Sequence, residues 1–283
     1  MQEIIEVNSA NMLEAINRSE IDMQIMTAQR IPRDIEKCKE NMIELACMDD
    51  AVSYNCFYHL ERKNKDGERS VIEGPSVRFA EIIAACWKNL RIASRIIGND
   101  GKTITAQGVC HDLESNVAIS TEVKRSILTS KGSTFSQDMQ VVVGNAASSI
   151  ALRNAICKVV PQVLIKSVVE NVKAKSLEHI KKIGVDESWS QWVAYMQTNY
   201  KVTETMLLEY LGRKREELTV DDIQKLVGIY NAIQEGTTTV EETFKKPKKQ
   251  EQQAVEAKGA AQAAQKRAEA AMNRNKGKGE ENA

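Results

Sequence analysis

Aromatic residues and glycine are scarce in this sequence: of its 283 residues, 5% are aromatic and 14 are glycine. This composition disfavours an all-β fold and favours one that is rich in helices. Hydrophobic residues make up 42%, which is enough to bury a core, and the length suits one or two domains. The sequence therefore predicts a helix-rich globular protein.

Long hydrophobic runs are also missing. No apolar stretch approaches the ~18 residues of a membrane-spanning helix, so we expect no contact with a membrane. The first methionine is followed by Gln2 and Glu3 rather than by an apolar secretory run. Six cysteines are scattered without a C-x-x-C pair, which is typical of reduced thiols. Together these features predict a cytoplasmic protein.

A net charge of one sign is absent as well, because 39 basic residues balance 39 acidic ones. Charge alone therefore predicts no polyanionic partner. The balance is uneven along the chain, since residues 245–283 carry ten Lys or Arg against five Asp or Glu and have few apolar side chains to bury. We expect a disordered basic tail there.

The first quarter of the chain predicts helices and then a hairpin. Residues 1–19 are polar and weakly periodic, which indicates a flexible N-terminal arm. From residue 21 to 46, apolar residues recur at helical spacing, and Pro32 divides them into two helical pieces. Residues 52–72 combine β-forming residues with an N-K-D-G-E turn, so we expect a hairpin.

The middle of the chain predicts one helix and a small sheet. An amphipathic helix is expected over 77–87, where the Ser76 hydroxyl can cap the first turn. Three runs of β-forming residues follow, and the short turns between them predict an antiparallel meander. These runs cover residues 89–97, 103–113 and 116–127.

A long helix is predicted over 137–160, where Pro161 stops it. Small residues recur along it, and such a stripe lets a helix lie close on a sheet. Arg153 falls at the edge of its apolar face, where an arginine is unfavourable without a counter-ion. The stripe consists of Gly144, Ala147, Ser148, Ala151 and Ala155.

Capped helical patterns continue up to the tail. We therefore divide the chain into an arm at 1–19, a core at 20–182, a small helical module at 183–244 and a tail at 245–283. The predicted fold class is α+β: an antiparallel hairpin and meander packed on a long helix, followed by a small helical C-terminal module and a disordered tail.

Motifs for catalysis are weak. The stretch G-N-D-G-K-T resembles the end of a phosphate loop, but its glycines are too close together, and a hairpin turn explains it better. No cysteine stands beside a histidine in a catalytic context. We expect no enzyme activity and no cofactor, and we keep a metal-dependent nuclease as an alternative. Its candidate ligands, whose spacing fits no known pattern, are Glu73, Glu81, His111, Asp112 and Glu114.

Basic residues gather in the middle of the chain, near the polar segment T-S-K-G-S-T-F-S. Such segments offer cations, hydroxyls and backbone amides to phosphates. The few aromatic residues argue against base stacking as the main mode of binding. For any single residue, a solvated charged surface remains the alternative. The candidate DNA-binding residues are Arg78, Arg91, Arg95, Lys124, Arg125, Lys131 and Arg153.

The predicted order of elements resembles the single-strand annealing protein superfamily, which includes phage annealing recombinases and the eukaryotic ring-forming annealing mediator. The segments IDMQIMTAQRIPRD, EGPSVRFAE, CHDLESN and SIALRNAICKVVP are similar to a family of phage-encoded proteins with this role. The resemblance covers roughly residues 20–175. Where the mediator has a Lys-Arg pair, this chain has Ser149 and Ile150, so only Arg78 and Arg153 carry over from it.

The resemblance implies ATP-independent binding of single-stranded DNA and annealing of complementary strands in phage homologous recombination. It implies a homo-oligomeric ring or helical filament, and a C-terminal module that docks a phage exonuclease or the host single-strand-binding protein. Arg78, the first-turn amides of its helix and Arg153 would hold phosphates in one positive groove. We expect alanine at either arginine to weaken DNA binding with little change in thermal stability. The alternatives are a non-annealing single-strand DNA-binding protein and a phage structural or assembly protein.

Overall fold

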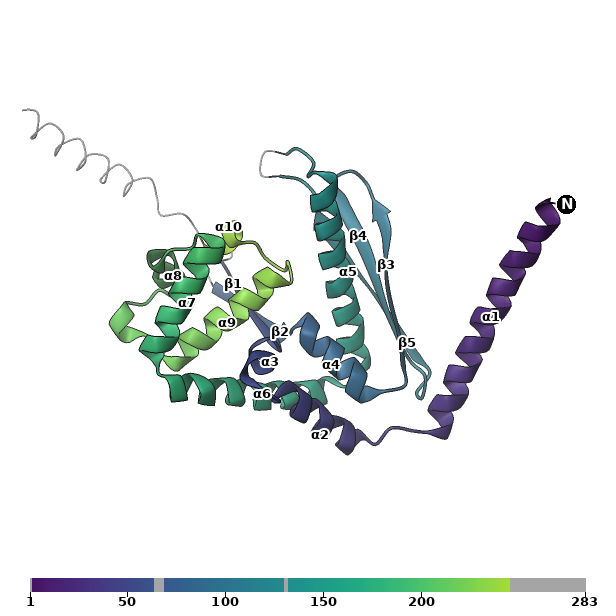
Figure 1. Cartoon of the computed structure of the whole chain (residues 1–283), viewed down its shortest axis with the longest axis horizontal. Helices are drawn as coiled ribbons and strands as arrows, with labels where there is room; N and C mark the ends of the chain where they lie inside the picture. The colour runs from purple at the N-terminus through teal and green to yellow at the C-terminus, as the bar shows by residue number, and fades with distance from the viewer. Residues whose placement is uncertain (1, 64–68, 130–131, 245–283) are drawn as a thin grey trace, which may run out of the picture.

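The protein is described from a computed structural model that covers residues 2–63, 69–129 and 132–244. These residues form an α+β fold, as predicted, with a two-stranded and a three-stranded antiparallel sheet. Figure 1 shows helix α5 with the three-stranded sheet on one side, helices α7 to α10 on the other, and α6 along the base. The expected hairpin turn at 64–68 and the expected disordered tail at 245–283 lie outside the described residues.

The N-terminal segment is one continuous helix, α1 (Gln2–Arg30), where a flexible arm was expected over 1–19. The segment contains neither proline nor glycine, so no residue in it stops a helix that runs back from Arg30. Pro32 separates α1 from α2 (Ile35–Ala46), and this predicted break is confirmed. In Figure 1, the N-terminal part of α1 extends away from the rest of the molecule.

A short helix precedes the hairpin. Residues at the start of the expected hairpin instead belong to α3 (Asp50–Tyr54), because Asp49 accepts a hydrogen bond from the Val52 amide at 2.7 Å and caps a helical turn. The antiparallel pair of β1 (Phe57–Lys63) and β2 (Arg69–Pro75) confirms the hairpin itself.

The helix α4 (Val77–Trp87) has the predicted bounds. The Ser76 hydroxyl accepts from the Phe79 amide at 3.0 Å, which confirms the predicted cap. Phe79, Ile83 and Trp87 share one face and are buried in the core that α4 forms with α2 and α6.

The three-stranded sheet has the order β3-β4-β5, so the predicted meander is confirmed. Helix α5 (Gln137–Val159) lies across one face, with its small-residue stripe against the strands. A Cβ atom at Gly108 of β4 would lie 2.3 Å from the Ala151 backbone, and the Thr121 hydroxyl donates to the Ala151 carbonyl at 2.7 Å. The strands are β3 (Leu90–Asn99), β4 (Thr103–Asp112) and β5 (Val117–Ser126).

The C-terminal helices enclose a second core around Trp189, Leu207 and Ile223. Thr219 and Thr239 form capping boxes, of which the second was predicted from sequence. No helix in the described ranges is long and apolar enough to cross a membrane. The elements are α6 (Gln162–Ile183), α7 (Val185–Tyr200), α8 (Glu204–Leu211), a 3₁₀ turn at Arg215–Glu217, α9 (Val220–Gln234) and α10 (Val240–Thr243).

Helix α9 joins the two cores, because it packs on β1 of the hairpin. A Cβ atom at Gly228 would lie 2.6 Å from the His59 Cβ, so glycine allows this close approach. The Asn231 side chain donates to the carbonyls of Tyr54 at 2.5 Å and Phe57 at 2.7 Å. These contacts hold the C-terminal end of α9 near α4 and α5.

The segments IDMQIMTAQRIPRD and CHDLESN meet at Arg33. Its guanidinium group binds the Asp112 carboxylate at 2.5 and 2.6 Å and lies 4.5 Å from the centre of the Trp87 ring. Burial opposes ionisation of Asp112, but hydrogen bonds from Arg33 and from the Glu114 amide outweigh it and lower the pKa of Asp112 to about 2. This pair fastens the α1–α2 connection to the end of β4.

Candidate nucleic-acid interface

The structure divides the predicted DNA-binding residues into two groups. Arg78, Arg125 and Arg153 lie around the end of α9, and we refer to them as the groove group. A second set, the outer-face group, projects from the sheet face that α5 does not cover, and Lys131 lies outside the described residues. The outer-face group consists of Arg91, Arg95 and Lys124.

Strand register places the outer-face group. Side chains alternate between the two faces of a strand, and the β4 residues that face α5 are the buried ones, such as Ala106 and Gly108. Arg91, Arg95 and Lys124 pair instead with the alternate, half-buried residues of β4. Arg95 and Lys124 are exposed, whereas Arg91 donates to the Gln24 side chain of α1 at 3.1 Å.

A groove with a volume of ≈ 950 Å³ runs between α4, α5 and the end of α9. Arg78 projects into solvent at its border, with 72% of its side chain exposed, and pairs with Glu81 at 3.2 Å. Asn145 and Ser149 of α5 line the opposite side. The structure therefore places Arg78 at the border of this groove.

Arg153 is buried, with 6% of its surface exposed. Its guanidinium group donates to the Glu235 carboxylate at 3.1 Å, so the counter-ion that its position requires comes from the C-terminal cap of α9. Glu235 lines the groove, whereas Arg153 lies behind it. This burial argues against the expectation that Arg153→Ala leaves thermal stability nearly unchanged, because the substitution would leave a carboxylate buried without its charged partner.

The first turn of α4 is also occupied by Glu235. One carboxylate oxygen of Glu235 accepts from the Val77 amide at 2.5 Å, and the other accepts from Arg153. Burial raises the pKa of Glu235, and the Val77 amide and Arg153 counteract this rise only in part. A helix N-terminus and a guanidinium group thus converge on a single carboxylate.

Arg125 of β5 contacts the same segment. It donates to the carbonyl of Gly236, and at 3.4 Å to the carbonyl of Thr237. Gly236 has a φ angle of +67°, and a Cβ atom there would lie 3.0 Å from the Ala146 Cβ of α5. The chain therefore turns sharply after α9 and lies against α5, where residues 235–237 cover two members of the groove group.

The groove is not positive in this arrangement, contrary to expectation. Among the described residues that line it, the charged ones are Arg78, Glu81 and Glu235. The two other members of the groove group are bound by α9 and by the residues that follow it. Any phosphate that reached Arg153 would have to replace Glu235.

Tyr58 and Glu235 are site residues that the sequence analysis did not identify. The Arg153 guanidinium carbon lies 4.8 Å from the centre of the Tyr58 ring, a cation–π geometry. A Cβ atom at Gly74 would lie 3.0 Å from the Tyr58 hydroxyl, so the glycine of I-E-G-P makes room for this ring. The arginine in an apolar helix face signals that a partner is needed, but no local pattern identifies Glu235.

A cluster of ionisable side chains lies around Glu73, which contacts His59 at 2.6 Å and Lys173 at 2.6 Å. No cluster of three or more metal-binding side chains occurs among the residues that the structure describes. All six cysteines are free, and burial raises the pKa of Cys56, Cys110 and Cys157 to about 12, which keeps these thiols protonated.

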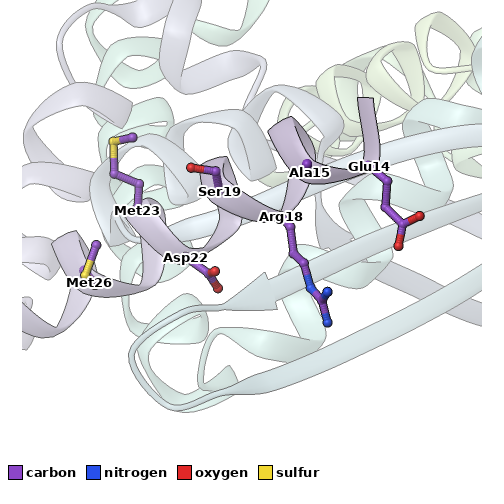
Figure 2. A pocket seen from close by; sticks show the side chains of 7 residues that line it. All are labelled: Glu14, Ala15, Arg18, Ser19, Asp22, Met23 and Met26. Carbon is purple, nitrogen blue, oxygen red and sulfur yellow. The ribbon is translucent and has the colours of Figure 1, made fainter. Parts of the chain in front are cut away.

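Further hollows lie outside the groove. One, ≈ 410 Å³ in volume, is lined by Tyr54, Trp192, Tyr195 and Tyr230, and the rings of the last three meet one another edge to face. Another follows α1 alone, and Figure 2 shows the side chains that line it, from Glu14 to Met26.

Comparison with known proteins gives no match to a family model, a curated protein or a solved structure.

Proposed function

We propose that the protein binds single-stranded DNA and anneals complementary strands without ATP and without making or breaking a covalent bond. The observation that carries this proposal is that Arg153 and the Val77 amide both donate to the carboxylate of Glu235. Carboxylates and phosphodiesters both present an oxyanion, and both are bound by guanidinium groups and helix N-termini. A site that holds the first is chemically suited to the second.

The groove supplies the path for the strand. Phosphates would lie along α4 and α5 near Arg78 and Arg153, with further neutralisation by Arg125. Holding one strand extended lowers the entropy that pairing must overcome, and cationic contacts reduce the repulsion between the two backbones. The outer-face group offers a second basic surface, together with the hydroxyl groups of Thr105 and Ser120.

The proposal includes self-assembly and partners. Large apolar side chains are exposed on α1, such as Met23 and Met26, and on β3, such as Ile96 and Ile97. Exposed apolar side chains can support contacts between subunits, and we propose a ring or helical filament with an annealing-type core. A phage exonuclease or the host single-strand-binding protein would dock on residues 183–244, and the protein would act in the cytoplasm of a bacterial host.

An annealing assay without nucleotide tests the proposal. Two complementary oligonucleotides, one with a fluorophore and one with a quencher, are mixed with and without protein in the presence of a chelator. We expect faster quenching with protein, and a rate that falls as the salt concentration rises. Unchanged pairing despite binding detected by anisotropy would instead indicate a single-strand-binding protein that only protects strands.

Absence of binding at low salt would contradict every form of the proposal. A phage structural or assembly protein would then be the better assignment, with the exposed apolar residues as its assembly contacts. Light scattering does not separate these cases, since both form oligomers, whereas binding of the oligonucleotide does.

A further inference from the structure

We infer that residues 235–237 are an internal competitor for the phosphate site, which nucleic acid must displace before it can reach Arg153 and Arg125. The inference rests on the proposed function and describes how access to that site is controlled. It is carried by three contacts that converge on this segment: the Val77 amide and Arg153 on the Glu235 carboxylate, and Arg125 on the carbonyls that follow.

The segment imitates a phosphate in charge and position. Glu235 supplies a carboxylate, and the carbonyls at the end of α9 carry the partial negative charge of a helix C-terminus. Arg125 donates to those carbonyls, so both guanidinium groups are bound to oxygens of the chain itself. Each of these contacts has a counterpart that a phosphodiester oxygen can provide.

The contacts around Glu235 are few for a buried carboxylate. It accepts one hydrogen bond from Val77 and one from Arg153, and 9% of its side chain is exposed. Burial raises the pKa of Glu235, so its charge is less well compensated here than in water. Fewer hydrogen bonds are lost when such a group is released than when a carboxylate with every lone pair satisfied is released.

The contacts of α9 restrict the proposed movement to the C-terminal end of this helix and the residues that follow it. Asn231 is fixed to the carbonyls of Tyr54 and Phe57, so most of α9 stays on the hairpin. Beyond it, the amides of Thr237 and Thr238 donate back to the Ala232 carbonyl at 2.8 and 3.3 Å. Opening this last turn would free Glu235 without separating the two cores.

The released site would be positive. With Glu235 withdrawn, Arg78, Arg125 and Arg153 would face one groove, with Glu81 as the remaining described acidic residue that lines it. The groove is therefore neutral or acidic while residues 235–237 are in place and basic once they are displaced. A nucleic-acid strand gains electrostatic attraction only as it displaces this segment.

Substitution of the two acidic residues of the groove provides a matched test. Glu235→Gln removes one negative charge from residues 235–237, and Glu81→Gln removes one from the exposed partner of Arg78. Affinity for a fluorescein-labelled oligothymidylate is measured by anisotropy over a range of salt concentrations, with full-length protein. We expect Glu235→Gln to tighten binding at least about threefold more than Glu81→Gln. The reason is that the state in which residues 235–237 have left Arg153 and Arg125 is then more populated.

Hydrogen exchange on the wild-type protein gives a second readout that requires no variant. We expect the amides of residues 236–238 to exchange faster when the oligothymidylate is bound, while those of α9 before Asn231 are unchanged. Equal affinities for the two variants, together with unchanged exchange on binding, would overturn the inference and leave the proposed function standing. Absence of binding by all three proteins at low salt would overturn both.

Discussion

Two buried arginine–carboxylate pairs in this molecule differ in how well their carboxylates are satisfied. In both pairs the side chains are shielded, with exposures of 5–7% for Arg33 and Asp112 and 7–9% for Arg153 and Glu235. Asp112 accepts from two guanidinium nitrogens, the Trp87 ring nitrogen and two backbone amides, whereas Glu235 accepts from one guanidinium nitrogen and one amide.

The pKa values of the two carboxyl groups reflect this difference. Burial acts on both, but hydrogen bonds lower the pKa of Asp112 to about 2, while the pKa of Glu235 stays above its ordinary value. The Arg33–Asp112 pair stabilises the packing of the α1–α2 connection on the end of β4. The second pair joins α5 to the end of α9. We propose that another anion can replace its carboxylate.

Removal of Arg33 should have the largest effect on stability. Arg33→Ala leaves the Asp112 carboxylate buried with its main partner lost and uncovers the Trp87 ring. We expect the free energy of unfolding to fall by about 4–5 kcal/mol, the upper part of the range for a broken buried pair. Chemical denaturation measures this loss. A decrease in the free energy of unfolding of less than about 1 kcal/mol would show that this pair contributes little to stability.

Removal of Arg153 should cost less stability but more binding. Arg153→Ala leaves Glu235 with the Val77 amide, and the carboxyl group can take up a proton more readily because its pKa is already raised. We expect a loss of about 3 kcal/mol, near the lower end of the same range. Among folded molecules, affinity for single-stranded DNA should fall, and a variant that stays folded with unchanged affinity would contradict the site.

The two pairs should respond to pH with opposite sign. The pKa of Asp112 is below its ordinary value, so the stability it contributes is present above about pH 4 and is lost as the pH falls toward 2. The pKa of Glu235 is raised, so the folded state binds its proton first, and stability increases as the pH falls through that pKa toward 4.5.

Neutral variants isolate these contributions. The destabilisation caused by Asp112→Asn should be greatest near pH 7 and shrink below pH 4. Relative to Glu235→Gln, the wild-type protein should become more stable as the pH falls from 7 to 4.5. Denaturation midpoints across this pH range test both statements, and a shared sign for the two residues would contradict the comparison.

Removal of Arg78 should have the smallest effect on stability. Its ion pair with Glu81 is exposed, and such pairs contribute about 0–1 kcal/mol. For Arg78→Ala we expect weaker binding of single-stranded DNA and a salt dependence reduced by about 0.7 in logarithmic slope, the value for one phosphate contact. Lys166→Ala, an exposed lysine on α6 away from the groove, is the control and should leave both quantities unchanged.

Local signals explain which parts of the fold could be predicted. The helix at Val77–Trp87 was predicted with its exact bounds because local signals define both ends. Ser76 caps its start, an apolar face runs along it, and a β-forming run follows directly. The small-residue stripe of α5 likewise predicted its close contact with the sheet. Residues 2–19 gave no apolar face, so helix propensity there was underestimated, and the β-forming Val52 was overruled by the cap at Asp49.

The candidate site could be predicted only in part, because its key contacts are long-range. Arg153 and Arg78 stand out in the sequence by type and position, but Glu235 lies 82 residues from Arg153 in the chain. It reaches Arg153 only because α9 packs on β1 through Gly228 and Asn231. Neither the hairpin nor α9 carries a local pattern that predicts this contact.

Photochemical cross-linking tests the central claim most directly, since it locates the strand on the protein. An oligothymidylate that carries bromodeoxyuridine is bound to the full-length protein, irradiated, and the modified peptides are identified by mass spectrometry. We predict cross-links within residues 77–85 of α4 and 142–153 of α5, on the two sides of the groove. Cross-links confined to the outer-face group, or to residues 245–283, would contradict the account.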